Sequence, residues 1–331
     1  MSIAYSFQSV VAPDLQRYIA LKRVLGRSFD NSAKIFFDLD CFLSGLGKAT
    51  ADLTPETFQK WSQTLEPLHP NTRLARMRAV RNFCLYRRRT IPACFVPDPT
   101  QFPRAGPVVR PYIFSGEEVA KLLLHCKDLR GSPLRRATTR LAIVLLYTTG
   151  LRRGELLRLT LQDYDPQAQT LLIRASKFHK SRLLPLPGDV VEEVKRFLQV
   201  RRAARPSLSP TASLLWSPCG QGLAYSANQI AKNVHILFER AGIKKPDGRQ
   251  PRVHDFRHSL AVNVLIRWYQ AGVDVQAKLP LLATWLGHVS ILSTYHYLHF
   301  VEGLRSAASR RFDRSFGDLV VPLAKQKGGP R

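Results

Sequence analysis

One stretch of this chain cannot form a continuous helix or a central strand. Six prolines lie in the segment 92–111, and they are Pro92, Pro97, Pro99, Pro103, Pro107 and Pro111. Each proline fixes its φ angle and has no N–H to donate, so the segment is expected to be an extended linker. The 331 residues are therefore expected to form two domains, one before and one after this linker.

The charge of the chain points to a polyanionic partner. Lys and Arg total 50 against 24 Asp and Glu, which leaves a formal net charge of +26. Self-repulsion of this size is typical of proteins that bind nucleic acid. An anionic membrane surface is the other candidate, but no basic amphipathic helix with a bulky apolar face is found. The longest apolar run, 141–147, is too short to cross a bilayer.

Cysteine usage and the N-terminus predict a cytoplasmic, nucleoid-associated protein. The five cysteines are widely spaced and form no C-x-x-C pair, which argues against a disulfide framework and against a zinc site. The first residues lack the basic segment and apolar core of a signal peptide. No metal and no cofactor are expected.

Residues 1–91 predict a small helical domain. Apolar residues at helical spacing begin after Pro13 and end before Gly26, and Thr54 with Pro55 is typical of a helix start. The last of four helical segments, 71–89, is strongly basic. Its arginines are expected to contact DNA, with a solvated helix face as the alternative, and they include Arg73, Arg76 and Arg81.

Residues after 111 predict a mostly α domain with a small β-sheet, an α+β arrangement. Ser115 and Glu118 form a capping-box pattern, and a long apolar helix is expected to stop at Gly150. Two strand-like runs, 170–176 and 182–187, flank a basic turn and predict a β-hairpin. Four further helical patterns follow.

Four motifs in this second half resemble the tyrosine recombinase family, also called the phage integrase family. In chain order they are TGLRRGELLRL at 149–159, ASKFHKSRLLPL at 175–186, HDFRH at 254–258 and LGHVSILSTYHYLH at 286–299. The resemblance covers the whole second half closely and the helical first half more weakly. The order and separation of the motifs make it specific.

The resemblance implies a domain plan and an assembly. It assigns residues 1–91 to an N-terminal helical core-binding (SAM-like) domain, 92–111 to the linker, 112–316 to the catalytic domain and 317–331 to a tail. The two domains would form a C-shaped clamp around double-stranded DNA, as a dimer on each site and a homo-tetramer on synapsed sites. An apolar run in the tail, 319–323, is a candidate for docking on a neighbouring protomer.

Strand cleavage by a protein nucleophile needs cations that hold the two non-bridging phosphate oxygens. Arginine suits this task because its planar fork matches two oxygens and stays protonated. The resemblance places the two catalytic arginines at Arg152 and Arg257. Arg153 falls on a variable position of the family and is given no role.

Proton transfer and hydrogen bonding to the phosphate are implied for His254 and His288, while His258 is expected to pack and support the site. Lys177, in the hairpin turn, is expected to protonate the leaving 5′ oxygen. Its rival, Lys180, is expected to contact the DNA backbone instead, as is Arg182.

The expected nucleophile is Tyr297. A phenol has a pKa near 10 and attacks poorly until neighbouring cations lower the cost of its ionisation. Tyr295 is the competing tyrosine, but the spacing from His288 selects Tyr297.

The predicted function is site-specific DNA recombination through a 3′-phosphotyrosyl intermediate, for a mobile element or a replicon. Two alternatives stay open. The first is a DNA-relaxing enzyme like the type IB topoisomerases, and the second is a basic DNA-binding regulator without catalysis. Target site, reaction direction and accessory proteins are not indicated by the sequence.

Overall fold

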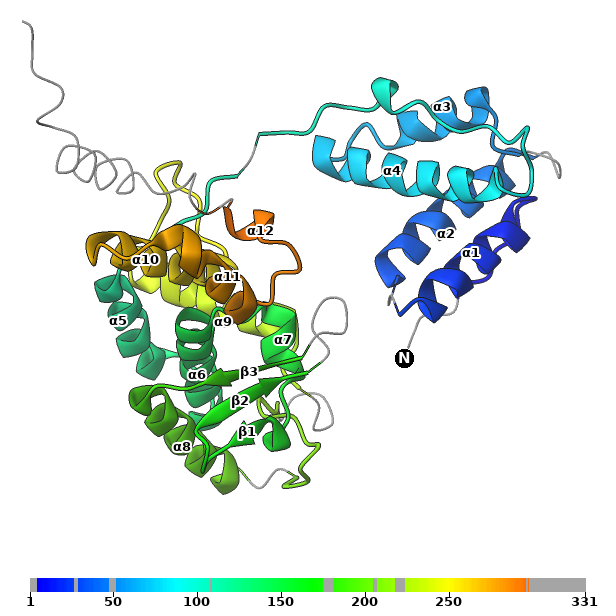
Figure 1. The fold of residues 1–331 in the computed structure, drawn as a ribbon. Helices are drawn as coiled ribbons and strands as arrows, with labels where there is room; N and C mark the ends of the chain where they lie inside the picture. Colours follow the sequence, from blue (N-terminus) through cyan, green and yellow to red (C-terminus); the bar gives the residue numbers. More distant parts are fainter. Residues whose placement is uncertain are drawn as a thin grey trace, which may run out of the picture. The chain divides into compact units, whose positions relative to one another are not determined.

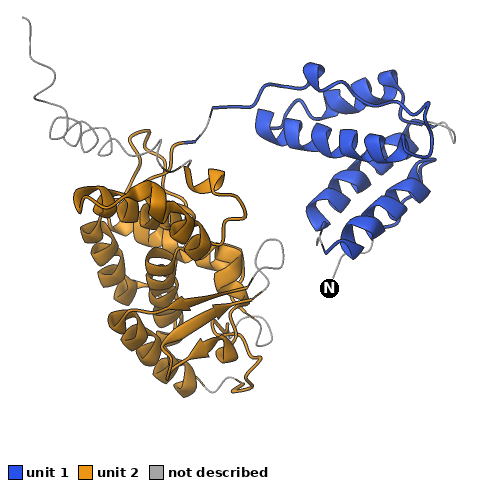
Figure 2. Ribbon diagram, in the orientation of Figure 1, with its two compact units in different colours: residues 1–109 blue, residues 110–331 orange. Residues whose placement is uncertain are grey.

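The computed structural model describes residues 5–26, 29–47, 52–107, 109–174, 181–204, 207–217, 224–295 and 297. The chain divides into two compact units, residues 1–109 and 110–331 (Figure 2). Each unit has a hydrophobic core of its own.

Unit 1 is built from four helices and one short 3-10 helix. They are α1 (Ala12–Val24), α2 (Asp30–Gly45), α3 (Pro55–Thr64), α4 (Pro70–Arg87) and η1 (Pro99–Gln101) (Figure 1). Thr54 caps α3 by accepting a hydrogen bond from the backbone N–H of Thr57, as its sequence pattern predicts. Aromatic rings fill the centre, where Phe36 and Phe83 are fully buried and their ring centroids lie 5.6 Å apart.

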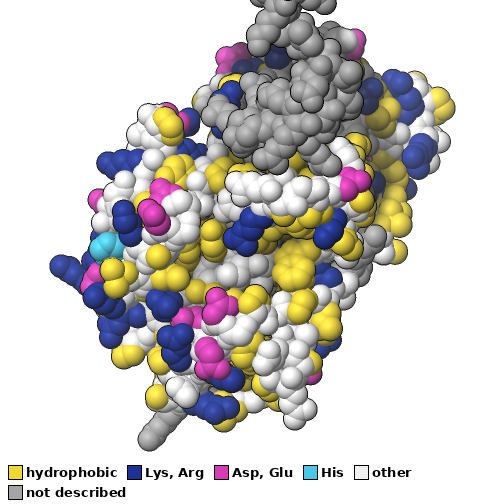
Figure 3. Space-filling model, turned by 60° about the vertical axis from the view of Figure 1, so that its left-hand side comes forward, with side chains coloured by type: hydrophobic (Ala, Val, Ile, Leu, Met, Phe, Trp, Pro, Cys, Tyr) yellow, Lys and Arg dark blue, Asp and Glu magenta, His cyan; other side chains and the backbone are white. Residues whose placement is uncertain are grey.

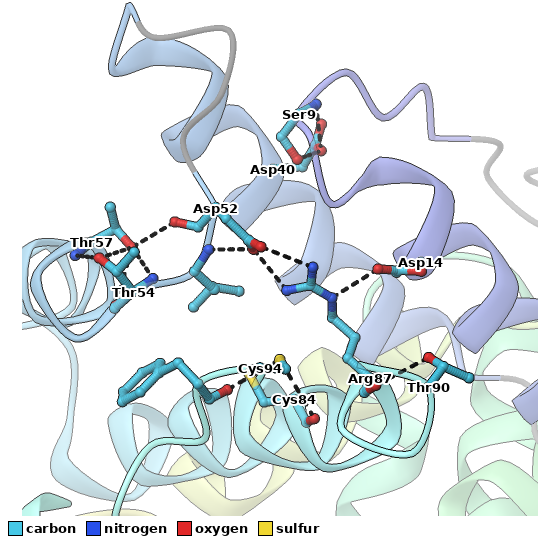
Figure 4. A network of polar contacts seen from close by, with 12 residues as sticks. Ser9, Asp14, Asp40, Asp52, Thr54, Thr57, Cys84, Arg87, Thr90 and Cys94 are labelled. Carbon is cyan, nitrogen blue, oxygen red and sulfur yellow. Dashed lines mark hydrogen bonds and ion pairs between the residues drawn. The ribbon is translucent and has the colours of Figure 1, made fainter. Parts of the chain in front are cut away.

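A buried arginine ties the helices of unit 1 together. Arg87, at the end of α4, donates from Nε to Asp14 of α1 at 2.8 Å and from Nη1 to Asp52 at 2.7 Å (Figure 4). Asp40 of α2 likewise accepts the backbone N–H groups of Gln8 and Ser9. These carboxylates neutralise and satisfy groups that would be costly to bury alone.

The proline-rich segment is not a free linker along its whole length. Cys94 and Phe102 are buried, and Phe95 and Val96 pack against the core of unit 1. Apolar side chains placed between the prolines gain enough from burial to hold this part of the segment on the helices. The chain therefore divides into its two units after residue 109, and residues 92–102 belong to unit 1.

Unit 2 combines helices with a three-stranded sheet (Figure 1). Its α-helices are α5 (Gly116–His125), α6 (Pro133–Thr149), α7 (Arg153–Arg158), α8 (Gly188–Ala203), α9 (Ala227–Arg240), α10 (Asp255–Gln270), α11 (Val275–Leu286) and α12 (Leu292–Tyr295). The strands are β1 (Tyr164–Asp165), β2 (Thr170–Ile173) and β3 (Arg182–Pro185), and two 3-10 helices are η2 (Cys126–Asp128) and η3 (Leu161–Asp163). The expected α+β class is confirmed.

Helix α6 is the central element of unit 2 and packs against α8, α9 and α10. The predicted hairpin is present, with β2 and β3 antiparallel and Ile173 paired with Arg182. Strand β1 extends the sheet by pairing Tyr164 with Leu171, which the sequence pattern did not predict. The turn of the hairpin, 175–180, lies outside the described residues.

Helix α6 ends where the sequence predicts, at Gly150. This residue has a φ of +64°, and a Cβ there would lie 2.8 Å from the side chains of both Leu260 and Leu286. Only glycine fits this turn, because it alone accepts the left-handed conformation without a side chain. The turn brings the end of α6 against α10 and α11, which carry the other motif residues.

Candidate active site and DNA-binding surface

Arg152 follows this turn and is the N-cap residue of α7. Its Nη1 donates to Oε1 of Glu155 at 2.7 Å, and its Nη2 donates to the carbonyl of Gly287 at 3.0 Å. The side chain keeps 27% of its surface exposed. Arg152 is thus held in a set orientation while part of its side chain faces solvent.

Glu155 is a buried carboxylate between two arginines. It accepts from Arg152 on one side and from Nη2 of Arg182 at 2.8 Å on the other. Burial would raise the pKa of Glu155, but the hydrogen bonds and charges of Arg182 and Arg152 outweigh it and lower the pKa to about 2. The sequence carried a signal for this role, since Glu155 lies three residues after Arg152 at the start of a helix.

Arg182, which is expected to contact the DNA backbone, is buried in the structure. Its side chain is 8% exposed, and its Nε donates to the carbonyl of Trp285 at 2.8 Å while the fork holds Glu155. A Cβ at Gly287 would lie 2.6 Å from Nη1 of Arg182, so the glycine of the fourth motif makes room for this arginine. Arg182 thus forms a buried ion pair that joins β3 to α7 and α11, and its expected contact with DNA stays a prediction.

Arg257 is the deepest cation of the site. It is 1% exposed, and its two terminal nitrogens donate to the carbonyls of Gly150 and Leu286 at 2.6 Å each. Burial, followed by the nearby positive charge of Arg152, lowers the pKa of Arg257 to about 10. It is therefore still protonated at neutral pH, and its position is determined by the ends of α6 and α11.

The two histidines of the third motif lie at the start of α10, His254 as its N-cap residue and His258 in its first turn, and their rings are neighbours as their spacing predicts. The ring centroids of His254 and His258 are 4.7 Å apart, with the planes nearly perpendicular. His254 is exposed, yet crowding of its ring by the protein, followed by the charge of Arg257, lowers its pKa. Burial and the neighbouring His254 lower the pKa of His258 to about 4, and both rings are neutral at pH 7.

Tyr297 lies among these groups. Its ring stacks on His288 at 5.9 Å and meets His258 edge-on at 5.4 Å between centroids. Burial raises the pKa of Tyr297, while the charge and hydrogen bond of Arg257 and the charge of Arg152 oppose that rise. The residue is 3% exposed.

His288 is fixed by a neighbour from α12. Its Nδ1 lies 2.8 Å from Oγ1 of Thr294, which is itself fully buried. Burial and the charges of Arg257 and Arg152 lower the pKa of His288 to about 3, so the ring is neutral. The competing tyrosine, Tyr295, is held elsewhere, since its hydroxyl donates to Oε1 of Gln276 at 2.7 Å.

The structure thus gathers the residues that three of the motifs predicted. Arg152 and His254 are the N-cap residues of α7 and α10, and Arg257 lies in the first turn of α10. His288 follows the end of α11, and Tyr297 is the last residue that the structure describes. Lys177 and Lys180 lie outside the described residues, as does the apolar run of the tail. Within the described ranges, no group of three or more His, Cys, Asp or Glu side chains could hold a metal ion.

The three arginines expected to contact DNA from α4 are half-buried. Arg76 forms an ion pair with Asp38 of α2 at 3.0 Å. The Nε atoms of Arg73 and Arg81 are buried without a hydrogen-bond partner.

The exposed face of α4 forms one wall of a groove in unit 1, with a volume of about 560 Å³. Arg78 and Asn82 line it from α4, Arg89 lines it from the turn that follows α4, and Lys22 lines it from α1. Aromatic side chains, including Tyr18 and Tyr86, complete the lining, and none of the lining residues is acidic. We name this feature the basic groove. The helical period of α4 could have shown that residues 78, 82 and 89 share a face.

Positive side chains are also spread over unit 2. Lys and Arg are distributed across the face shown in Figure 3 and are not gathered into one patch. In the part of the chain that the structure covers, no helix is both long and apolar enough to span a membrane.

Comparisons with known proteins agree with the geometry. Residues 113–302 match the family model described as "Phage integrase family". The "Putative integrase/recombinase y4rB" of Sinorhizobium fredii (strain NBRC 101917 / NGR234) is 32% identical over 310 residues, which cover 92% of this chain and 97% of that protein.

Solved structures share the fold at low sequence identity. The XerH site-specific recombinase bound to palindromic difH substrate aligns with a TM-score of 0.63 at 20% identity, covering 89% of this chain and 83% of that one. The Tn1549 transposon integrase in complex with transposon right end DNA aligns with a TM-score of 0.63 at 17% identity, covering 91% and 98%.

Proposed function

The chain belongs to the phage integrase family and is a site-specific recombinase that cleaves and rejoins DNA, and on this premise we propose that Tyr297 is its nucleophile. One observation carries the proposal. The Tyr297 ring lies against His258 and His288, and the charges of Arg257 and Arg152 act on its hydroxyl. A phenol among cations and neutral imidazoles is suited to attack on a phosphodiester.

In the proposed step, the phenol oxygen forms a bond to phosphorus and the bond from phosphorus to the 5′ oxygen breaks. The phenol proton passes to neutral His254, and Lys177 protonates the leaving 5′ oxygen. The product is a 3′-phosphotyrosine with a free 5′-hydroxyl. Because the bond energy is kept in that linkage, the reverse attack by a 5′-hydroxyl rejoins the strand without another energy source.

Arg152 and Arg257 would neutralise the two non-bridging oxygens during this step. Both guanidiniums are already oriented by backbone carbonyls, those of Gly287 for Arg152 and of Gly150 and Leu286 for Arg257. Groups fixed before the reaction stabilise charge without reorganising. His288, kept neutral and held by Thr294, would add a hydrogen bond to the phosphate.

The nucleophile is 3% exposed without DNA. Attack requires its oxygen to meet phosphorus, so we infer that DNA binding opens the packing around Tyr297. Such a closed site protects the phenol from other electrophiles until a substrate is present.

A nicked suicide substrate tests the nucleophile. Tyr297→Phe is expected to bind target DNA with near-normal affinity and to form no covalent complex. Tyr295→Phe is the matched control, because it removes a hydroxyl two residues away that bonds Gln276, and it should still form the adduct. A covalent complex from Tyr297→Phe, seen by denaturing gel, would contradict the assignment.

The alternative functions differ in product. A DNA-relaxing enzyme would remove supercoils from a plasmid and leave two recombination sites unexchanged. A non-catalytic regulator would leave the suicide substrate unmodified. Exchange of strands between two sites, abolished by Tyr297→Phe, is the result expected here.

We further propose that the DNA comes from a mobile element or a replicon, that a dimer binds each site and that two dimers form a tetramer in synapsis. The y4rB relative, named an integrase/recombinase, supports the first part. Recombination of such DNA would place the protein in the cytoplasm, at the nucleoid. Mapping covalent adducts across the end sequences of the host element, and sizing the protein–DNA complexes, tests both parts.

A further inference from the structure

Arg252 lies two residues before His254 and has no part in the chemistry proposed above. Pro251 and Val253 are buried, whereas Arg252 and His254 are exposed, so both side chains lie on the solvent side of the same short segment. The positive charge of Arg252 is among the influences that lower the pKa of His254, after burial and Arg257. Arg252 is therefore close to the place expected for the scissile phosphate.

A buried carboxylate holds Arg252 in position. Asp255, the first residue of α10, is fully buried and accepts from Nε and Nη2 of Arg252 at 3.2 and 2.9 Å. The backbone N–H of Arg252 donates to the same carboxylate at 2.9 Å, and Nζ of Lys245 lies 3.8 Å away. Two cations thus face one carboxylate, which leaves one positive charge in excess.

This arrangement suits the binding of a second anion. The side chain of Arg252 is 46% exposed, unlike that of Arg257. Its hydrogen bonds to Asp255 use the Nε and Nη2 edge of the guanidinium. Because Asp255 has already ordered the side chain, little rotamer entropy is lost when a phosphate arrives. Successive phosphates of a strand rise by about 3.4 Å along the helix axis, so a strand at His254 carries a second phosphate close by.

We propose that Arg252 binds the DNA phosphate next to the scissile one and so sets the register of the strand in the active site. The proposal rests on the function above only in taking His254 as the marker of the scissile phosphate. The other role open to Arg252 is to cap α10 through Asp255. The two roles differ in how DNA binding depends on salt.

Binding is measured in the Tyr297→Phe background, so that no cleavage occurs. Arg252→Ala should reduce the slope of log affinity against log salt by about 0.9, the value for one lost phosphate contact. Arg249→Ala is the matched control from the same loop, since Arg249 is 76% exposed and paired with Asp247 at 2.6 Å. It should leave the slope unchanged. If Arg252→Ala fails to fold, Arg252→Gln keeps a donor for Asp255 without the charge.

A neutral methylphosphonate then locates the contact. Placed in turn on each side of the scissile position, it should weaken binding by about tenfold at one of them in the parent protein. In the Arg252→Ala protein the same linkage should cost less than about twofold, because the partner is already gone. Equal losses in both proteins, or a lower melting temperature with an unchanged salt slope, would overturn the proposal.

These readings do not depend on catalysis. If Tyr297 formed no adduct with any substrate, the proposed function would fall, while the salt slope would still report on Arg252. If Arg252→Ala left the salt slope unchanged while Tyr297 formed a normal covalent adduct, only the proposed role of Arg252 would be contradicted.

Discussion

At the scale of single residues, the same side chain does different work according to its surroundings. Arg152, Arg182 and Arg257 all lie near the site, yet Arg182 is enclosed by Glu155 and a carbonyl, whereas the side chain of Arg152 is partly exposed. The three guanidiniums therefore differ in their partners as well as in their exposure, which is 1% for Arg257. Glu155 holds two of them in place, because it accepts hydrogen bonds from Arg152 and from Arg182.

Glu155→Gln is expected to destabilise unit 2 in a pH-dependent way. The pKa of Glu155 is lowered from its ordinary value of 4.5 to about 2 in the folded state, so its ionisation stabilises the fold above pH 4.5 and loses that effect as pH falls toward 2. The shift corresponds to about 3 kcal/mol at neutral pH. Chemical denaturation should show that the deficit of the variant narrows by about 1 kcal/mol between pH 7 and pH 4.

Glu192→Gln is the control for that prediction. Glu192 is exposed and paired with Lys195 on the surface, where an ion pair contributes little. A pH-independent deficit in Glu155→Gln, or the same deficit in the control, would contradict the account of the buried carboxylate.

At the scale of elements, the site depends on where helices stop. The carbonyl of Gly150 ends α6 and that of Leu286 ends α11, and both accept from Arg257. The last turns of two helices thus fix the deepest cation of the candidate site. The partial negative charge at a helix C-terminus adds to the attraction.

Gly150→Ala is expected to cost at least about 2 kcal/mol of unfolding free energy, since it combines a positive φ with a close contact. It should also slow cleavage by more than tenfold, because Leu260 and Leu286 must move and Arg257 with them. Gly188→Ala, at the first residue of α8 with open space around it, should be neutral. Thermal unfolding and single-turnover cleavage measure both. Normal cleavage by Gly150→Ala would show that Arg257 is positioned by other contacts.

Sequence patterns predicted the elements of this site better than its contacts. Caps at Thr54 and Ser115 and the stop at Gly150 are local signals, so the helices they bound could be predicted. The partner of Arg182 could not, because Glu155 is 27 residues away and meets it only after β3 packs beside α7. Strand β1 was not predicted, because a strand of two residues is too short to show the alternation of apolar and polar residues.

At the scale of the whole molecule, charge alone predicted the class of partner but not the residues that meet it. Arg76 was expected to face DNA, but Asp38 of a neighbouring helix neutralises it. Arg78 and Arg89 have no acidic neighbour in the lining of the basic groove. Only the packing of α1, α2 and α4 distinguishes these cases, since all three arginines lie on one helix or its end.

Binding strength should therefore depend on the basic groove more than on the total charge. Replacing both Arg78 and Arg89 by Ala should lower the slope of log DNA affinity against log salt by about 2. Two phosphates would no longer be neutralised by the protein, so their counterions would no longer be released on binding. Arg76→Ala should change it by much less, since Asp38 already neutralises that side chain. Titrations of the Tyr297→Phe protein at several salt concentrations measure the slopes, and thermal unfolding confirms that each variant folds. If the pair from the groove and Arg76 changed the slope equally per residue, the contacts would follow overall charge and the groove would have no special place in binding.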